Sequence, residues 1–300
     1  MKTNIDLKKI CFLVNPQKDT IAIKAYLEWV LAEVAHKMPK WIVQLFHQEW
    51  PSDLLNFDEV WVMGGDGTFN YFVNKYPDCS ISIGLFAGGT GNDFYWKIFG
   101  KISKEEHLGH ILNGQTARLD AGQVNHMIFL NGVGIGIEGD VLKSMQAIRF
   151  IGGALGYYLA AIPQLFKFKS YVISFERAGK IISKKVFLCM VFNSSRAGGG
   201  FHFFPMASIQ DGVLNMMLCN PIAIIKRLFY MPLIQKGKHV NYTFLEFSTI
   251  QSTRIHCNRV LSAQVDGEVL ESDIFDFKIL PAKFKYIVPN YSQKFYIHDS

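Results

Sequence analysis

The sequence has few cysteines, a modest share of charged residues and no hydrophobic run long enough to cross a membrane. Its cysteines are odd in number, scattered and without a CxxC pair, which argues against a disulfide framework or a zinc ribbon and favours a reducing compartment. The longest uncharged stretch, at residues 150–166, contains a proline and falls short of a membrane span. The apolar run near the N-terminus is too short for a secretory signal peptide. We therefore expect a soluble, cytoplasmic protein.

The overall composition is that of a folded protein with a large core. Of the 300 residues, 49% are hydrophobic and 19% charged, so disorder is not expected, and the length allows one large domain or two smaller ones. The net charge of +6 suits anionic partners such as nucleotides or acidic lipid surfaces. No basic tract interleaved with aromatic residues predicts binding to nucleic acid, and no feature specifies an oligomeric state.

The pattern of predicted secondary structure changes near residues 116–120. Before this point, short apolar runs alternate with helical patterns, which predicts an α/β domain with parallel strands over residues 1–118. After it, many β-prone segments separated by glycine-rich or polar turns predict an antiparallel sandwich or barrel over residues 119–284. One helical insertion is expected at about residues 139–167.

The apolar run VWVMGGDGTFNYFV at residues 60–73 breaks into glycines and an aspartate at its centre. Glycine lets a ligand approach the main chain closely. We expect Thr68 to cap a helix that follows, whose N-terminus would suit a phosphate group. The stretch has neither the GK[ST] of a Walker loop nor GxGxxG spacing. Two interpretations of Asp66 stay open: a cation bridges it to a phosphate, or it accepts hydrogen bonds from the main chain of a tight turn.

Two further breaks carry acidic or hydroxyl side chains. IGLFAGGTGNDFYW, at residues 83–96, again ends a strand in glycines. Two such ends predict neighbouring parallel strands that face one crevice, where α/β sheets bind ligands. The third break, AQVDGEVL at residues 263–270, places Asp266 and Glu268 on either side of Gly267. Taken alone, a hairpin turn accounts for this Asp–Gly pair.

Taken together and in this order, the motifs resemble those of the diacylglycerol kinase catalytic family, in particular bacterial lipid kinases related to diacylglycerol and sphingosine kinases. The resemblance covers almost the whole chain. The segments that carry it are GGDGT at 64–68, GTGND at 89–93, FLNGVGIGIEGDV at 129–141, GGGFHFFPMASIQDGVLNM at 198–216 and VDGE at 265–268. GGDGT alone also occurs in NAD kinases.

The resemblance implies a fold of two domains. The first would be a Rossmann-like, NAD-kinase-like α/β domain that binds nucleotide. The second would be an antiparallel β-sandwich domain that binds lipid, with the active site in the cleft between the two. Residues 285–300 would return to the first domain.

The resemblance also implies an activity: transfer of the γ-phosphate of ATP, with Mg²⁺, to a hydroxyl of diacylglycerol or a related lipid. Glu268 would accept the proton, with Asp66 competing for that role, and Asp211 would bind a magnesium ion with main-chain oxygens near Ser208 and Val213. Such an enzyme would serve lipid metabolism and phospholipid biosynthesis from the cytoplasm, at the inner membrane face. The residues implied to hold ATP are Asn15, Gly64, Gly65, Asp66, Gly67, Thr68, Phe69, Asn70, Gly89, Thr90, Asn92 and Asp93.

The sequence departs from the family pattern at several positions, which keeps alternatives open. NPQKDT at residues 15–20 lacks the glycine that is usual in the first turn, and Tyr71 stands where the family commonly has a glutamate. The usual proline before GTGND is missing. Trp96 stands where the family has a basic residue, although Lys97 follows it immediately. The alternatives are a kinase of NAD type or of another hydroxyl, and a nucleotide-binding protein with little catalysis. The helix-like stretch at residues 147–169 either packs on the sandwich or lines the access of lipid and rests on an anionic membrane surface.

Overall fold

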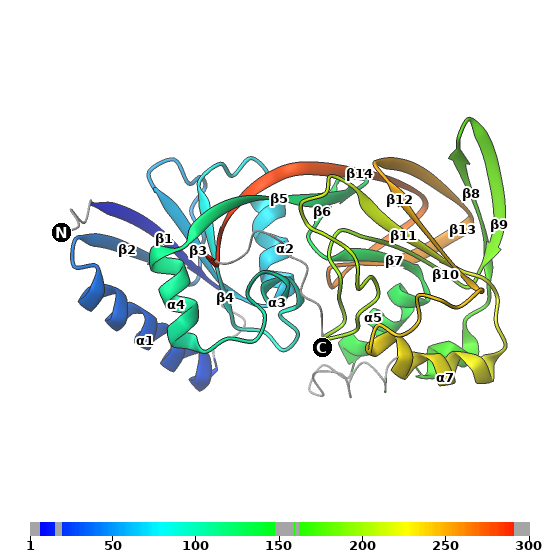
Figure 1. Cartoon of the computed structure of the whole chain (residues 1–300), viewed down its shortest axis with the longest axis horizontal. Helices are drawn as coiled ribbons and strands as arrows, with labels where there is room; N and C mark the ends of the chain where they lie inside the picture. The colour runs from blue at the N-terminus through cyan, green and yellow to red at the C-terminus, as the bar shows by residue number, and fades with distance from the viewer. Residues whose placement is uncertain (1–6, 16–19, 148–158, 160–161, 291–300) are drawn as a thin grey trace. The chain divides into compact units, whose positions relative to one another are not determined.

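The computed structural model describes residues 7–15, 20–147, 159 and 162–290. These residues form two compact units, of which the first holds the chain up to Leu119 and again from Phe284, and the second holds Asp120–Lys283. Strands β5 (Gln115–Val124) and β14 (Glu268–Val288) each begin in one unit and end in the other (Figure 1).

The first unit is built on a parallel sheet. Its strand order is β14–β4–β3–β1–β2, and β14 joins through the pairing of Tyr286 with Ile83. Strand β3 is buried along its whole length because helices cover parallel sheets, whereas the edge strand β2 is half exposed. The strands are β1 (Lys8–Val14), β2 (Trp41–Phe46), β3 (Glu59–Gly64) and β4 (Ser82–Ala87).

Four helices connect these strands or follow them. Helices α1, α2 and α3 contact β2, β3 and β4 respectively. Side chains cap two of them: Thr20 Oγ accepts from the Ile23 N–H at the start of α1, and Ser103 Oγ accepts from the Glu106 N–H at the start of α4. The helices are α1 (Ile21–Lys37), α2 (Asp66–Lys75), α3 (Asp93–Phe99) and α4 (Lys104–Asn113).

The second unit is built on antiparallel strands in the order β12–β11–β10–β7–β13–β14, with the β8–β9 hairpin paired to β13. Its core is rich in aromatic residues from several of these strands. Helices α5 (Ile137–Ala147) and α7 (Ile224–Gln235) lie on one side of the strands (Figure 1). The remaining strands are β6 (Met127–Phe129), β7 (Gly132–Gly136), β8 (Tyr171–Arg177), β9 (Lys180–Val186), β10 (Leu188–Phe192), β11 (Leu214–Cys219), β12 (Leu245–Ile250) and β13 (Ser252–Val265).

The predicted fold class, an α/β domain followed by an antiparallel β-sandwich domain, is confirmed. The predicted helical insertion corresponds to α5 and to the helical residues 162–167, and the stretch between them lies largely outside the described residues. Residues 16–19 of the NPQKDT turn and residues 291–300 of the predicted return segment also lie outside them. None of the helices in the described part of the chain combines the length and apolarity that crossing a bilayer requires.

Candidate nucleotide and phosphotransfer site

The two glycine turns of the first unit pack directly against each other. They follow β3 and β4, which are neighbouring parallel strands, as predicted. The Gly88 N–H donates to the Gly64 carbonyl at 2.8 Å. A Cβ on Gly65 would lie 2.9 Å from Gly89 Cα, and one on Gly89 would lie 2.5 Å from Gly65 Cα. Close packing of the two turns therefore requires glycine at these positions.

Helix α2 begins at Asp66, so the prediction that Thr68 caps a later helix start is wrong. Gly65 occupies the N-cap position in an extended conformation, with no side-chain cap. Thr68 lies inside the first turn of the helix, buried, and its Oγ accepts a 2.7 Å hydrogen bond from Asn15 Nδ2. Thr68 thus ties the end of β1 to the glycine turn.

The carboxylate of Asp66 connects the two turns. Its Oδ2 accepts from the Asp93 N–H at 3.0 Å and its Oδ1 from the Phe94 N–H at 2.9 Å, at the start of α3. Asp66 therefore accepts main-chain hydrogen bonds across to the second turn, which the interpretation of a single tight turn did not include. Because each carboxylate oxygen can accept more than one hydrogen bond or cation, this role does not exclude a contact with a metal ion or a ligand.

The second turn is locked by its own asparagine. Asn92 adopts a left-handed backbone conformation (φ 51°), and its side chain bonds both the N–H and the carbonyl of Gly89 at 2.8 Å. Thr90 is exposed on the same turn. The short polar side chain of asparagine tolerates this conformation better than other side chains do, so Asn92 sets the shape of the turn from within.

Gly67 differs from its neighbours because packing does not explain it. It is exposed, its φ is not left-handed, and a Cβ there would meet no atom within 4 Å. It lies at the N-terminus of α2, where the first N–H groups of a helix have no intrahelical acceptor and favour an anion. The surface around Gly67 is therefore open to a phosphate group that approaches the main chain.

Four of the residues predicted to hold ATP have buried side chains. Phe69 is 1% exposed, Asn70 and Asp93 are each 2% exposed, and Thr68 is 5% exposed. Asn70 Oδ1 accepts from Asn74 Nδ2, one turn further along α2. The side chains of Phe69 and Asn70 therefore pack beneath the first glycine turn. A nucleotide would contact the exposed main chain of this turn and not these two side chains.

In the second unit, Asp266 is a buried carboxylate that was predicted only as part of a turn. It forms the two-residue loop of the β13–β14 hairpin with Gly267; both residues have positive φ, and Val265 pairs with Glu268. Its carboxylate accepts from the main-chain N–H groups of residues 130–132. Asp266 thus fastens the hairpin to the segment that leads into β7. Glu268 itself is exposed, at the first position of β14.

The residues predicted to bind a magnesium ion share one turn ahead of β11. Asp211 is exposed and its Oδ1 accepts from the Val213 N–H, while Ser208 Oγ accepts from the Gln210 N–H. The buried carboxylate of Asp120 holds this turn by accepting from the Gly212 N–H at 2.8 Å.

A carboxylate, a hydroxyl and main-chain oxygens are the hard donors that Mg²⁺ takes, so the residues of this turn fit the ion. No group of three or more His, Cys, Asp or Glu side chains in the described part of the chain is arranged to hold a metal ion. The fit therefore depends on main-chain and hydroxyl oxygens beside the single carboxylate of Asp211.

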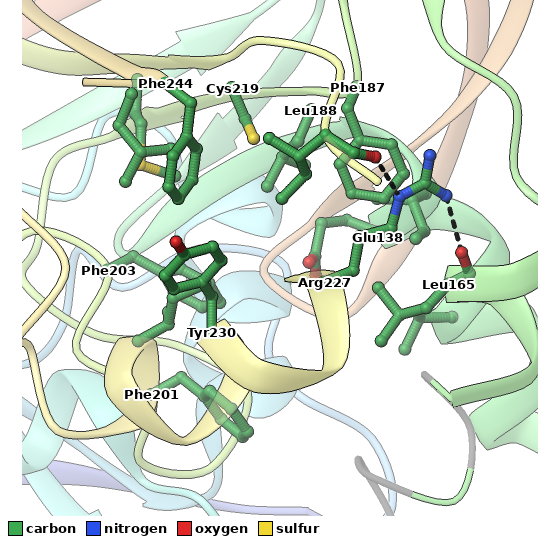
Figure 2. Close-up of a pocket in the computed structure, with 16 residues that line it drawn as sticks. Glu138, Leu165, Phe187, Leu188, Phe201, Phe203, Cys219, Arg227, Tyr230 and Phe244 are labelled. Carbon is green, nitrogen blue, oxygen red and sulfur yellow. Dashed lines mark hydrogen bonds between the residues drawn. The ribbon is translucent and has the colours of Figure 1, made fainter. Parts of the chain in front are cut away.

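The second unit also contains an apolar pocket, shown in Figure 2. It holds about 660 Å³ of space between atoms, part of it open to solvent. Arg227 of α7 lies over the Phe187 ring at 4.0 Å, and its Nη1 donates to the Leu165 carbonyl at 2.6 Å. Burial lowers the pKa of the Arg227 guanidinium. The other lining residues are mostly aliphatic or aromatic: Ile137, Glu138, Val141, Leu165, Leu188, Phe201, Phe203, Met217, Cys219, Ile222, Tyr230, Ile234, Phe244 and Leu245.

Comparison with known proteins gives the same two-part division of the chain. The diacylglycerol kinase catalytic domain matches residues 9–124, and the YegS C-terminal NAD kinase beta sandwich-like domain matches residues 131–288. A diacylglycerol kinase of Bacillus subtilis is 25% identical over 74% of this chain and 75% of its own. A Shewanella frigidimarina protein named "Probable lipid kinase YegS-like" is 23% identical over 96% of this chain and 90% of its own.

Solved structures share the fold. A diacylglycerol kinase from Bacillus anthracis superposes with a TM-score of 0.72 at 21% identity, covering 94% of this chain and 97% of the other. An NAD kinase from Archaeoglobus fulgidus superposes with a TM-score of 0.54 at 13% identity, covering 93% of each chain. These two likenesses concern the fold alone. The matched domains, which together span most of the sequence, show that this chain belongs to the family of diacylglycerol kinases and YegS-type lipid kinases.

Proposed function

We propose that this chain is an ATP- and Mg²⁺-dependent lipid kinase that phosphorylates a hydroxyl group of diacylglycerol or a related lipid. The observation that carries the proposal is the pair of glycine turns joined through Asp66, with the exposed main chain of Gly67 at the N-terminus of α2. Family membership supports a phosphotransferase activity.

The first unit would bind the nucleotide. Main-chain N–H groups at the start of α2 would meet the phosphates, while Asn15 and Thr68 hold the turn in shape and Thr90 and Asn92 line the second turn. Mg²⁺, when bound, would neutralise charge on the phosphates. Asp66 fixes the geometry between the turns, which is a positioning role and can accompany a contact with the metal.

The transfer needs positioning and charge neutralisation more than a strong base. The acceptor oxygen would form a bond to the γ-phosphorus as the bond to the bridging oxygen of ADP breaks, and the hydroxyl proton would pass to a carboxylate. We assign that proton to Glu268, because it is the exposed carboxylate next to the Asp266 hairpin, whereas both oxygens of Asp66 already accept main-chain hydrogen bonds.

Two other parts of the second unit complete the proposal. Ser208, Asp211 and Val213 would hold a magnesium ion that stabilises the turn before β11. The apolar pocket beside α7 would receive an acyl chain of the acceptor, since its walls offer almost only hydrocarbon. The enzyme would act at a membrane surface in the cytoplasm and serve phospholipid biosynthesis.

The test is the transfer of label from γ-labelled ATP to one of several acceptors. Diacylglycerol in mixed micelles should become labelled, whereas NAD should not. Label on NAD alone would favour the second candidate, a kinase of NAD type. This candidate is included because an NAD kinase shares the fold. Stabilisation by nucleotide without label on any acceptor would indicate a nucleotide-binding protein with little catalysis.

Two variants test the assignment of the carboxylates. Glu268→Gln should leave the melting temperature unchanged because Glu268 is exposed, and should lower kcat by about 100-fold or more. Asp66→Asn should lower both the melting temperature and kcat, because it disturbs the acceptor of two main-chain N–H groups. Near-normal turnover in Glu268→Gln would reject it as the proton acceptor.

A further inference from the structure

The net positive charge of this chain arises from two stretches that contain no acidic residue. Residues 141–175 and 212–245 hold 8 of the 31 Lys and Arg residues and none of the 25 Asp and Glu residues. The rest of the chain therefore has a slight excess of acidic residues, and the net charge of +6 arises from these two stretches. Such segregation of charge indicates a surface suited to an anionic partner.

The two stretches meet in the second unit. Arg227 of α7 donates from Nη1 to the carbonyls of Leu165, at 2.6 Å, and Phe168, at 3.2 Å. The helical residues 162–167 therefore lie beside α7, tied to it through main-chain oxygens. The lysines beside these two segments, Lys167, Lys169 and Lys226, are exposed and have no ion-pair partner among the described residues.

Large apolar side chains are exposed on the same two segments. On α7, Ile225 is 78% and Phe229 is 68% exposed; they are four residues apart and so share one helix face. On the neighbouring segment, Ile162 and Phe166 are 39% and 51% exposed, again four residues apart. Two adjoining segments therefore each expose a pair of large apolar side chains, and exposed apolar surface of this kind marks an interaction site.

Other side chains of helix α7 face the apolar pocket. Arg227 and Tyr230 line it (Figure 2), whereas Ile225 and Phe229 of the same helix are exposed. A helix with exposed Ile and Phe, flanked by lysines and without acidic residues, has the composition of helices that lie in the interface of an anionic membrane. A protein partner would not by itself account for the complete absence of acidic residues.

We propose that α7 and residues 162–169 form the face with which this chain docks on an anionic lipid bilayer. Ile225, Phe229, Ile162 and Phe166 enter the headgroup region, and the neighbouring lysines contact anionic lipid. The inference rests on the proposed function only in that the acceptor is a lipid. Docking itself requires no turnover.

The test is co-sedimentation of the full chain with vesicles of phosphatidylcholine alone or with added phosphatidylglycerol. The chain should bind the anionic vesicles, and raising the salt concentration should weaken binding. Ile225→Ser with Phe229→Ser should lower the affinity at least about ten-fold. Lys226→Ser should lower it about five-fold for anionic vesicles only.

A matched control removes exposed apolar side chains elsewhere. Ile181 in the β8–β9 hairpin is 82% exposed and Leu55 in the first unit is 88% exposed. Ile181→Ser with Leu55→Ser should leave vesicle binding unchanged. The proposal would be overturned if both double variants lost vesicle binding to the same extent. It would also be overturned if the double variant of Ile225 and Phe229 bound vesicles as tightly as the unaltered chain. A change of oligomeric state in light scattering, without a loss of vesicle binding, would assign the face to self-association instead.

Failure of this inference and failure of the proposed function give different results. If the unaltered chain phosphorylates lipid in micelles but the Ile225–Phe229 variant still binds anionic vesicles, only the docking face is wrong. If the chain docks on vesicles through this face but phosphorylates no lipid, the docking face stands and the kinase proposal fails. Nucleotide-induced thermal stabilisation should be equal in all variants, because the altered residues are in neither glycine turn.

Discussion

The substitution Gly67→Ala separates a role in nucleotide binding from a role in folding. The structure leaves room for the new methyl group, since a Cβ at Gly67 would meet no atom within 4 Å, and the backbone there is not left-handed. Gly67 is also a helical residue of α2. Alanine exceeds glycine in helix propensity by about 0.8–1 kcal/mol in a helix interior, and by less in the first turn.

We therefore expect Gly67→Ala to keep or raise the free energy of unfolding while it weakens nucleotide binding. A gain of up to about 1 kcal/mol corresponds to a rise in melting temperature of about 2–4 °C. The methyl group would occupy the space through which a phosphate reaches the main chain, so the dissociation constant for ATP should rise at least ten-fold, or about 1.4 kcal/mol. Calorimetric titration measures the affinity, and thermal unfolding measures the stability.

Two other glycines serve as controls. Gly109 lies inside α4, and a Cβ there also meets no atom within 4 Å, so Gly109→Ala should give a similar gain in stability with unchanged ATP affinity. Gly65→Ala should instead destabilise the fold by about 1–3 kcal/mol, because its Cβ would lie 2.9 Å from Gly89 Cα. Unchanged ATP affinity in Gly67→Ala would refute the placement of the phosphates at the start of α2.

Three further predictions concern a buried carboxylate, a buried histidine and the magnesium turn. Asp266→Ala should lower the free energy of unfolding by about 3 kcal/mol or more in urea titrations, because the N–H groups of residues 130–132 lose their acceptor. Asp266→Asn should lower it less, and an unchanged free energy of unfolding in Asp266→Ala would contradict the stabilising role of this carboxylate. Burial lowers the pKa of His107 to about 3, against about 6.5 in an unfolded chain. The unfolded state therefore binds the extra proton first, and stability falls as the pH drops from about 6.5 toward about 3, by up to about 1.4 kcal/mol per pH unit; His107→Leu should reduce this slope in urea unfolding followed against pH. Removing Mg²⁺ with EDTA should lower the melting temperature of the unaltered chain but not that of Asp211→Ala, and equal shifts in both would reject this turn as a magnesium site.

Much of the fold followed from local pattern. The buried strand at residues 59–64 and the antiparallel strands after residue 119 were predicted correctly, because alternation and β-branched content reflect the environment of each strand directly. The start of α2 was predicted three residues too late. The prediction depended on the Thr68 side chain as N-cap. In the structure Gly65, which has no side chain, is the N-cap residue. The Thr68 hydroxyl instead accepts a hydrogen bond from Asn15, at the end of β1.

The contacts within the candidate site could likewise be predicted only in part from the sequence. The sequence indicated which residues carry acidic and hydroxyl groups, and it left two interpretations of Asp66 open. Only the structure shows that Asp66 bonds the start of α3, because that contact joins residues 27 and 28 positions apart. Asp266 reaches even further, to N–H groups more than 130 positions away, and no local pattern encodes such a distance.

The amino-acid sequence by itself determined the glycine turns, the two-part division into α/β and β texture, and the two stretches without acidic residues. These are properties of neighbouring residues, and composition and periodicity record them. The tertiary structure decided that packing requires Gly65 and Gly89 whereas Gly67 faces open space, and it joined α7 to residues 162–169 through Arg227. Those outcomes depend on contacts between segments that only the folded chain brings together, so no inspection of one segment at a time could have supplied them.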